Sequence, residues 1–330
     1  METMKDPGNV VEFEDLCTRF ETERGTVRAV DGVSFAIPKG KTVCVVGESG
    51  CGKSVTSLSL MGLCKASEGE IRFNLGDRAM DVTKASEKEL QKLRGDRMAM
   101  IFQEPMTALN PVFPIGKQVA EVLERHYPEM SRREVKKRVL EMLGKVGIAN
   151  KDRVYGMYPH QLSGGMRQRI CIAMALICSP ELIIADEPTT ALDVTIQAQV
   201  LELLHDLKEQ TGCSVLLITH DLGVVAHMAD FVVVMYAGRV VERGTVEDIF
   251  RHAAHPYTLG LLASKPVVGR KQEKLHSIGG SVPDPVDLPA HCYFRERCHH
   301  DCCDGYPEEV QLSDTHFVSC FRYQEENHGT

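Results

Sequence analysis

The stretch Gly47-Glu-Ser-Gly-Cys-Gly-Lys53-Ser54 decides the fold of this chain. It follows the short apolar run Thr42-Val-Cys-Val-Val46, and a helix is predicted to begin at Lys53. Glycines let backbone N–H groups close around phosphate oxygens, and the new helix points its positive dipole end at the same phosphates. A strand, a glycine-rich turn and a helix in this order predict a phosphate-binding P-loop. A glycine-rich turn of some other α/β protein is the alternative, which the flanking elements disfavour.

Residues beyond this loop can supply the other groups that nucleotide hydrolysis needs. Lys53 would reach the β- and γ-phosphates, and the Ser54 hydroxyl would bind Mg²⁺. The predicted strand Leu182-Ile-Ile-Ala-Asp186 ends in a carboxylate that can hold the Mg²⁺ shell, and Glu187 can polarise water as a general base. His220 lies at the tip of another predicted strand, where ligands gather in α/β sheets, so a γ-phosphate contact is expected. Each of these features alone also fits solvated or structural polar residues at the end of a strand.

Strands alternate with helices along the chain, which predicts a mostly parallel α/β core. Two opening strands are expected at 10–20 and 27–37, and Ser131-Arg-Arg-Glu134 is a capping box that begins an amphipathic helix. After Thr245 prolines and then cysteines interrupt the pattern, so residues 250–330 are predicted to form a loop-rich C-terminal module. The other predicted elements are helices at 163–177 and 194–210 and strands at 182–186, 215–219 and 231–236.

Composition restricts the class of protein. The 330 residues carry a net charge of −8, and no basic stripe stands out, so nucleic acid is not an expected partner. No apolar run approaches the roughly 20 residues that span a bilayer. The polar N-terminus does not resemble a secretory signal. If this protein works at a membrane, it is expected to dock to other subunits.

The segment Leu162-Ser-Gly-Gly-Met-Arg-Gln168 resembles the signature motif of ABC ATPases. A serine, two glycines and a helix N-terminus make a second anion site. In that family the motif caps the ATP of a second subunit, so the resemblance implies a head-to-tail dimer around two ATP molecules. It also implies an α/β fold with a P-loop ABC ATPase core, an antiparallel β subdomain and an α-helical subdomain at about 104–178. The ATPase domain would cover 1–249, and the C-terminal extension would cover 250–330.

The family's remaining motifs match one by one. Gln103 resembles the Q-loop glutamine that senses Mg²⁺ and the γ-phosphate, Thr190-Ala-Leu-Asp193 resembles the D-loop, and Phe20 is the candidate for the aromatic residue that stacks on adenine. The implied catalytic residues are Glu187, His220 and Gln103. The implied nucleotide contacts are Phe20, Gly47, Ser49, Gly50, Cys51, Gly52, Lys53, Ser54, Val55, Ser163, Gly164, Gly165 and Asp193, and the implied Mg²⁺ contacts are Ser54, Gln103 and Asp186.

Finer features narrow the family. The run from Asp186 to Gln199, Met166 within the signature motif, and His255-Pro-Tyr-Thr-Leu259 resemble the D-type ATP-binding subunit of dipeptide and oligopeptide permeases. The resemblance implies an ATPase at the cytoplasmic face of the cell membrane that powers peptide import. Its implied partners are a companion ATPase, two membrane permeases and an extracytoplasmic binding protein. Nickel or glutathione as cargo remains open, and a non-transport ABC ATPase of DNA repair or translation is the alternative from another class.

A cysteine cluster marks the C-terminal module: Cys292, Cys298, Cys302, Cys303 and Cys320. In a chain without an export signal such a cluster favours a metal over disulfides. Four thiolates suit a [4Fe–4S] cluster, and the resembling permease subunits commonly carry a similar late cysteine set. The expected ligands are Cys292, Cys298, Cys320 and Cys302, with Cys303 as the alternative to Cys302. Zn²⁺ is the second candidate because four thiolates also suit a tetrahedral site, and free or disulfide-bonded cysteines are the third.

Overall fold

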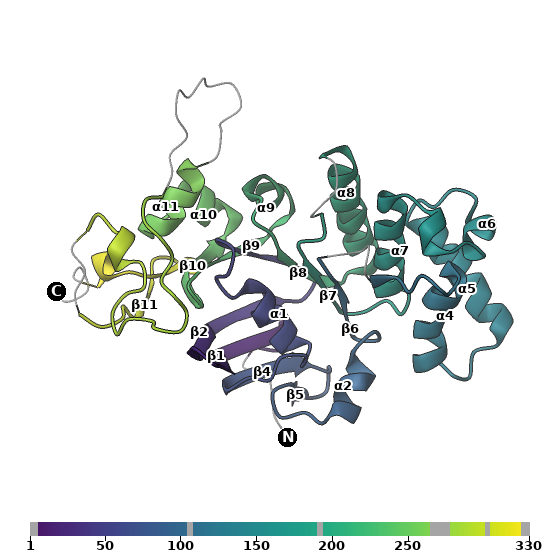
Figure 1. The fold of residues 1–330 in the computed structure, drawn as a ribbon, viewed down its shortest axis with the longest axis horizontal. Coiled ribbons are helices and arrows are strands. Elements are labelled where there is room, and N and C mark those ends of the chain that lie inside the picture. The colour runs from purple at the N-terminus through teal and green to yellow at the C-terminus, as the bar shows by residue number, and fades with distance from the viewer. Residues whose placement is uncertain (1–5, 104–107, 190–193, 265–277, 301–303, 325–330) are drawn as a thin grey trace. The chain divides into compact units, whose positions relative to one another are not determined.

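The computed structural model describes residues 6–103, 108–189, 194–264, 278–300 and 304–324. The chain forms two compact units. The P-loop unit comprises residues 1–36, 42–83 and 218–330, and the helical unit comprises residues 37–41 and 84–217. Figure 1 labels most of their elements along the chain. Among the described residues, no helix combines the length and the apolar character needed to cross a membrane.

An antiparallel sheet in the P-loop unit has the strand order β2-β1-β4-β5. Its strands are β1 (Asn9–Thr22), β2 (Gly25–Pro38), β4 (Glu68–Asn74) and β5 (Ala79–Asp81). Val11 of β1 lies opposite Phe73 of β4, and Phe13 lies opposite Ile71. All four side chains are buried, so one face of this sheet belongs to the core. The two opening strands and the antiparallel β subdomain predicted from the sequence are therefore confirmed.

The other strands of the P-loop unit follow the order β11-β12-β10-β9-β3. They are β3 (Thr42–Val46), β9 (Phe231–Tyr236), β10 (Arg239–Thr245), β11 (Glu309–Gln311) and β12 (Phe317–Ser319). β3 is buried along its whole length and runs parallel to β9, as a near-continuous apolar run predicts. The helical segments of this unit are α1 (Lys53–Leu60), α9 (Leu222–Met228), α10 (Val246–Arg251), α11 (Pro256–Ala263), η2 (Arg295–Arg297) and η3 (Phe321–Tyr323).

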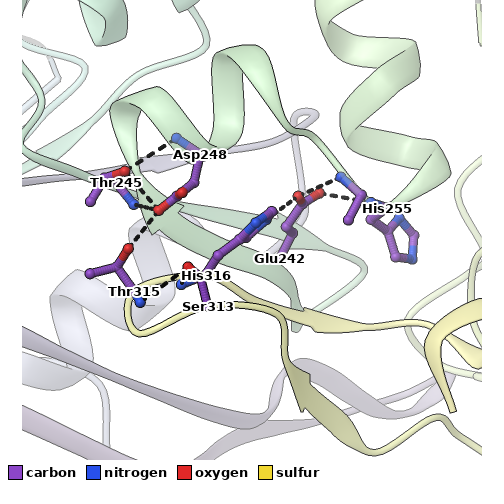
Figure 2. A network of polar contacts seen from close by, with 8 residues as sticks. Glu242, Thr245, Asp248, His255, Ser313, Thr315 and His316 are labelled. Carbon is purple, nitrogen blue, oxygen red and sulfur yellow. Dashed lines mark hydrogen bonds and ion pairs between the residues drawn. The ribbon is translucent and has the colours of Figure 1, made fainter. Parts of the chain in front are cut away.

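The C-terminal region, residues 250–330, adds two strands to this sheet. β12 pairs with the edge of β10, and β11 pairs with β12. A buried carboxylate fastens this region (Figure 2). Glu242 of β10 accepts hydrogen bonds from the backbone N–H groups of Ala254 at 2.7 Å and His255 at 2.9 Å, and its Oε1 lies 2.8 Å from Nε2 of His316. Glu242 and His316 are both buried, so this contact between β10 and the C-terminal region is shielded from solvent.

The helical unit contains three strands in the order β8-β7-β6: β6 (Met98–Ile101), β7 (Leu182–Asp186) and β8 (Ser214–Ile218). Its helical segments are α2 (Glu87–Leu93), α4 (Ile115–His126), α5 (Arg132–Lys145), α6 (Lys151–Tyr155), η1 (Pro159–Gln161), α7 (Gly164–Leu176) and α8 (Val194–Thr211). α4 packs against α5, α6 and α7 (Figure 1). The predicted capping box is present, since Ser131 and Glu134 exchange side-chain to backbone hydrogen bonds at the start of α5.

Candidate functional site

Three glycines shape the loop between β3 and α1, and all three have positive φ. A Cβ at Gly47 would lie 2.2 Å from the carbonyl oxygen of Met235, and one at Gly52 would lie 2.3 Å from that of Ala29. Both positions therefore admit only glycine. A Cβ at Gly50 would meet no atom within 4 Å, so the middle of the loop is open. The structure fits a loop that can close around a phosphate chain.

Lys53 ends this loop and begins α1. Its side chain is buried, and its ammonium donates hydrogen bonds of 2.9 Å to the carbonyl oxygens of Gly47 and Glu48. The cation is thus held at the loop itself, where a phosphate would need it. Ser54 and Val55 follow in the first turn of α1, half-buried, while Ser49 is exposed. Cys51 lies inside the loop as a buried thiol whose pKa is raised by that burial.

A pocket of about 540 Å³ opens beside Ser49 and Gly50. One wall comes from the β1–β2 hairpin, through Val27 and Arg28, and another comes from the C-terminal segment Val282–Leu288. Pro285 in that segment accepts a backbone hydrogen bond of 2.9 Å from Arg28. This wall could not be predicted from the sequence, because it joins residues about 250 positions apart. Phe20 on β1 is 38% exposed and is not among the residues that line the pocket.

The helical unit brings Gln103 and Glu187 together. Nε2 of Gln103 donates a hydrogen bond of 3.1 Å to Oε2 of Glu187. Asp186 is buried at the end of β7, and Glu187 follows it with a φ of 44°, a left-handed conformation that is rare outside glycine. Such strain is typical of functional positions. Gln168 of α7 donates to the carbonyl oxygen of Pro188 at 2.5 Å, which ties the signature helix to this turn.

Ser163 is the N-cap of α7, and its hydroxyl accepts a hydrogen bond of 3.4 Å from the N–H of Met166. Gly164 and Gly165 form the first helical turn. Ser163 is exposed, so the positive end of a 13-residue helix is accessible to an anion from outside this chain.

His220 is exposed just after β8, and it belongs to the P-loop unit. The predicted D-loop, Thr190 to Asp193, lies outside the described residues. The structure describes the P-loop with His220 in one unit and Gln103, Asp186, Glu187 and the signature motif in the other. Within the second set, hydrogen bonds join Gln103 to Glu187 and Gln168 of α7 to Pro188.

The prediction of a [4Fe–4S] cluster is wrong. Among the described residues, no group of three or more His, Cys, Asp or Glu side chains is arranged to hold a metal ion, which leaves the Zn²⁺ alternative without support as well. Cys292, Cys298 and Cys320 are free thiols, and burial raises the pKa of Cys292 and Cys320. Cys302 and Cys303 lie outside the described residues. The sequence shows how many thiols the region contains, but a metal site also requires several of them around one point.

Comparison with known families gives two matches along the chain. Residues 30–190 match the ABC transporter family, and residues 241–302 match the oligopeptide/dipeptide transporter C-terminal region. The oligopeptide transport ATP-binding protein AppD of Bacillus subtilis is 51% identical over 323 residues, which cover 96% of this chain and 98% of that protein. The dipeptide transport ATP-binding protein DppD of the same organism is 51% identical over 320 residues, or 94% of each chain.

Solved structures agree with these matches. The dimeric structure of MJ0796, a bacterial ABC transporter cassette, aligns with a TM-score of 0.64 and 30% identity over 72% of this chain and 98% of that one. CbiO1 of Clostridium perfringens, part of an ABC transporter complex, aligns with a TM-score of 0.63 and 28% identity over 74% of this chain and 92% of that one. The fold and the P-loop thus define an ATP-binding cassette of the ABC transporter class. Within that class, the chain belongs to the family of oligopeptide and dipeptide transport ATP-binding proteins.

Proposed function

We propose that this chain hydrolyses ATP to power the import of dipeptides or oligopeptides through an ABC transporter. The observation that carries the proposal is the presence, in one chain, of a P-loop with its lysine in place and of the C-terminal region typical of oligopeptide and dipeptide transporters. The P-loop supports ATP as the energy source, and the C-terminal region supports peptides as the cargo. We also propose the domain boundary between residues 249 and 250, close to the start of the C-terminal family match at residue 241.

Different residues of this chain serve the different tasks of ATP hydrolysis. The backbone of the P-loop and the ammonium of Lys53 hold the phosphates, and Ser54 and Asp186 bind the Mg²⁺ shell. Bound Mg²⁺ neutralises charge on the phosphate oxygens. Glu187 is the general base that takes a proton from the attacking water, and the hydrogen bond from Gln103 holds its carboxylate in one orientation. His220 contacts the γ-phosphate, and Phe20 stacks on adenine.

A second subunit completes each nucleotide site in this proposal. Ser163 is exposed at the N-terminus of α7, where it can cap the γ-phosphate of an ATP that a partner holds. The partner is a companion ATPase, and the pair docks on the cytoplasmic face of two membrane permeases that receive peptide from an extracytoplasmic binding protein. MJ0796, whose cassette fold this chain shares, has been solved as a dimer.

The proposal is tested by purifying the chain with the permeases and companion ATPase of its own cell and placing the assembly in lipid vesicles. Uptake of a labelled dipeptide or oligopeptide should require ATP, Mg²⁺ and this chain. ATP hydrolysis without peptide uptake, over a panel of peptides of two to six residues, would retain the ATPase and overturn the cargo. The same assembly with Lys53→Ala gives the background.

A further inference from the structure

The C-terminal region contacts the P-loop directly through Glu48, the residue that follows Gly47. Arg297 of η2 donates hydrogen bonds from Nη1 to Oε2 of Glu48 at 2.7 Å and from Nη2 to Oε1 at 3.0 Å. The two residues are 249 positions apart in the sequence. A guanidinium that meets both oxygens of a carboxylate fixes orientation as well as distance. The side chain of Arg297 is 3% exposed and that of Glu48 is 31% exposed, so the guanidinium is buried and the carboxylate is partly open to solvent.

Arg297 is itself held from several sides. Its Nε donates to the carbonyl oxygen of Gly279 at 2.8 Å, and its guanidinium carbon lies 5.6 Å and 5.9 Å from the ring centres of Tyr236 and Phe294. The hydrogen bonds to Glu48 raise the pKa of Arg297 further above its ordinary value. The guanidinium is therefore held by Gly279 and Phe294 of the C-terminal region and by Tyr236 of β9, in addition to Glu48.

A second residue of the C-terminal region meets the backbone of Glu48. The N–H of Glu48 donates a hydrogen bond of 2.8 Å to the hydroxyl of Tyr257, whose ring is fully buried on α11. The carbonyl oxygen of Glu48 in turn accepts from the ammonium of Lys53 at 2.9 Å. Glu48 thus connects two residues of the C-terminal region to the lysine of the P-loop.

We propose that Arg297 and Tyr257 are positioning residues for the P-loop, and that through Glu48 the C-terminal region sets the affinity of this chain for MgATP. The inference rests on the proposed function, because it requires that the P-loop bind nucleotide. Without these contacts the carboxylate and N–H of Glu48 lose their partners, and the loop gains conformations that must be lost again when phosphate binds. The C-terminal region then acts on the ATP site as well as on its own fold.

The test compares Arg297→Met with Glu309→Gln in the full-length purified chain. Glu309 is the control because it receives an equally bidentate pair from Arg243, at 2.8 Å and 2.6 Å, which joins β10 to the C-terminal region away from the P-loop. Calorimetric titration with MgATP should show a dissociation constant raised about tenfold in Arg297→Met and unchanged in Glu309→Gln. Arg297→Lys, which keeps the charge without the fork, should fall between Arg297→Met and the wild type.

A second measurement needs no nucleotide. Hydrogen exchange of the amides of residues 47–54 should be faster in Arg297→Met than in the wild type, and unchanged in Glu309→Gln. Tyr257→Phe removes one hydroxyl from a site that keeps its ring, so it should raise the MgATP dissociation constant even if Arg297→Met folds poorly. Folded Arg297→Met and Tyr257→Phe proteins with wild-type affinity and exchange would overturn the inference. Absence of MgATP binding by the wild type would instead overturn the proposed function.

Discussion

The side-chain amide of Gln103 donates a hydrogen bond of 3.1 Å to the carboxylate of Glu187, although the two residues lie 84 positions apart. Gln103 follows β6 and Glu187 follows β7, and these two strands are parallel neighbours, so their carboxyl ends bring both side chains to one edge. Glu187 also holds a left-handed backbone conformation. A carboxylate that is carried on a strained backbone and oriented by an amide is a suitable general base for water attack.

Replacement of Glu187 by glutamine should abolish turnover while MgATP binding stays close to that of the wild type. Glutamine keeps the shape of the side chain but cannot take a proton, and loss of a general base typically costs about 10² to 10⁴ in rate. Single-turnover hydrolysis by the assembled transporter measures the effect, with the companion subunit's equivalent residue changed in parallel. Glu181→Gln, just before β7 at its opposite end, should hydrolyse ATP normally. A wild-type rate in Glu187→Gln would remove Glu187 from its role.

Replacement of Lys53 by alanine should weaken nucleotide binding itself. The ammonium is the positively charged group of the P-loop. Its loss should raise the MgATP dissociation constant at least about tenfold. The change also leaves the carbonyl oxygens of Gly47 and Glu48 without the hydrogen bonds that Lys53 donates, so a small loss of thermal stability is expected. Lys65→Ala, on the exposed segment after α1, serves as the control and should change neither quantity. Calorimetry on the purified chain measures both affinities.

Ser163→Ala and Ser131→Ala should separate a cap that only stabilises a helix from one that also serves a nucleotide. Both serines are exposed N-caps, so each substitution should cost about 1 kcal/mol of unfolding free energy. Only Ser163→Ala should lower ATP hydrolysis by the assembled transporter, because Ser163 is expected to cap a partner's ATP. Urea unfolding and steady-state hydrolysis give the two readouts. Equal activity in both variants would contradict the role of the signature motif.

Acid should destabilise the fold through His255. Burial lowers the pKa of His255 to about 4, with nearby Glu242 acting in the opposite direction. Its Nδ1 accepts a hydrogen bond of 3.1 Å from the N–H of Tyr257, which only the neutral ring can do. The unfolded chain takes up this proton near pH 6.5 and the folded chain only near 4, so stability falls as the pH drops through this window, by at most about 3 kcal/mol. His255→Asn, which keeps an acceptor at the N-cap of α11, should flatten the dependence of urea unfolding on pH between 6.5 and 4.

Local patterns in the sequence predicted those parts of the fold that local physics determines. The apolar run at 42–46 and the glycines after it predicted β3, the P-loop and the start of α1 at Lys53, and Ser131 with Glu134 predicted the start of α5. β11 and β12 could not be predicted in this way. Each has three residues, too few to show an alternating pattern, and they form because β10 offers an edge.

Long-range contacts and the geometry of a metal site could not be predicted from the sequence. Nothing near Arg297 indicates that it meets Glu48, because an ion pair across 249 positions depends on how α11, η2 and β3 pack. The prediction of a metal cluster at the cysteines of the C-terminal region was wrong because it also depended on how distant residues pack. Spacing along the chain counts thiols, whereas a metal site requires several of them at bonding distance around one point.

The pairing of β12 with β10 determines how a C-terminal truncation of this protein should behave. Glu242 and Arg243 of β10 lie opposite Val318 and Phe317, so the last strands protect backbone groups that would otherwise face solvent. A truncated chain that ends after β10 would expose an unpaired strand edge beside the buried Val241. Exposed strand edges of two molecules can pair with each other, which leads to aggregation. Such a truncated ATPase should precipitate during purification, and a minimal soluble version of this motor must retain its last strand.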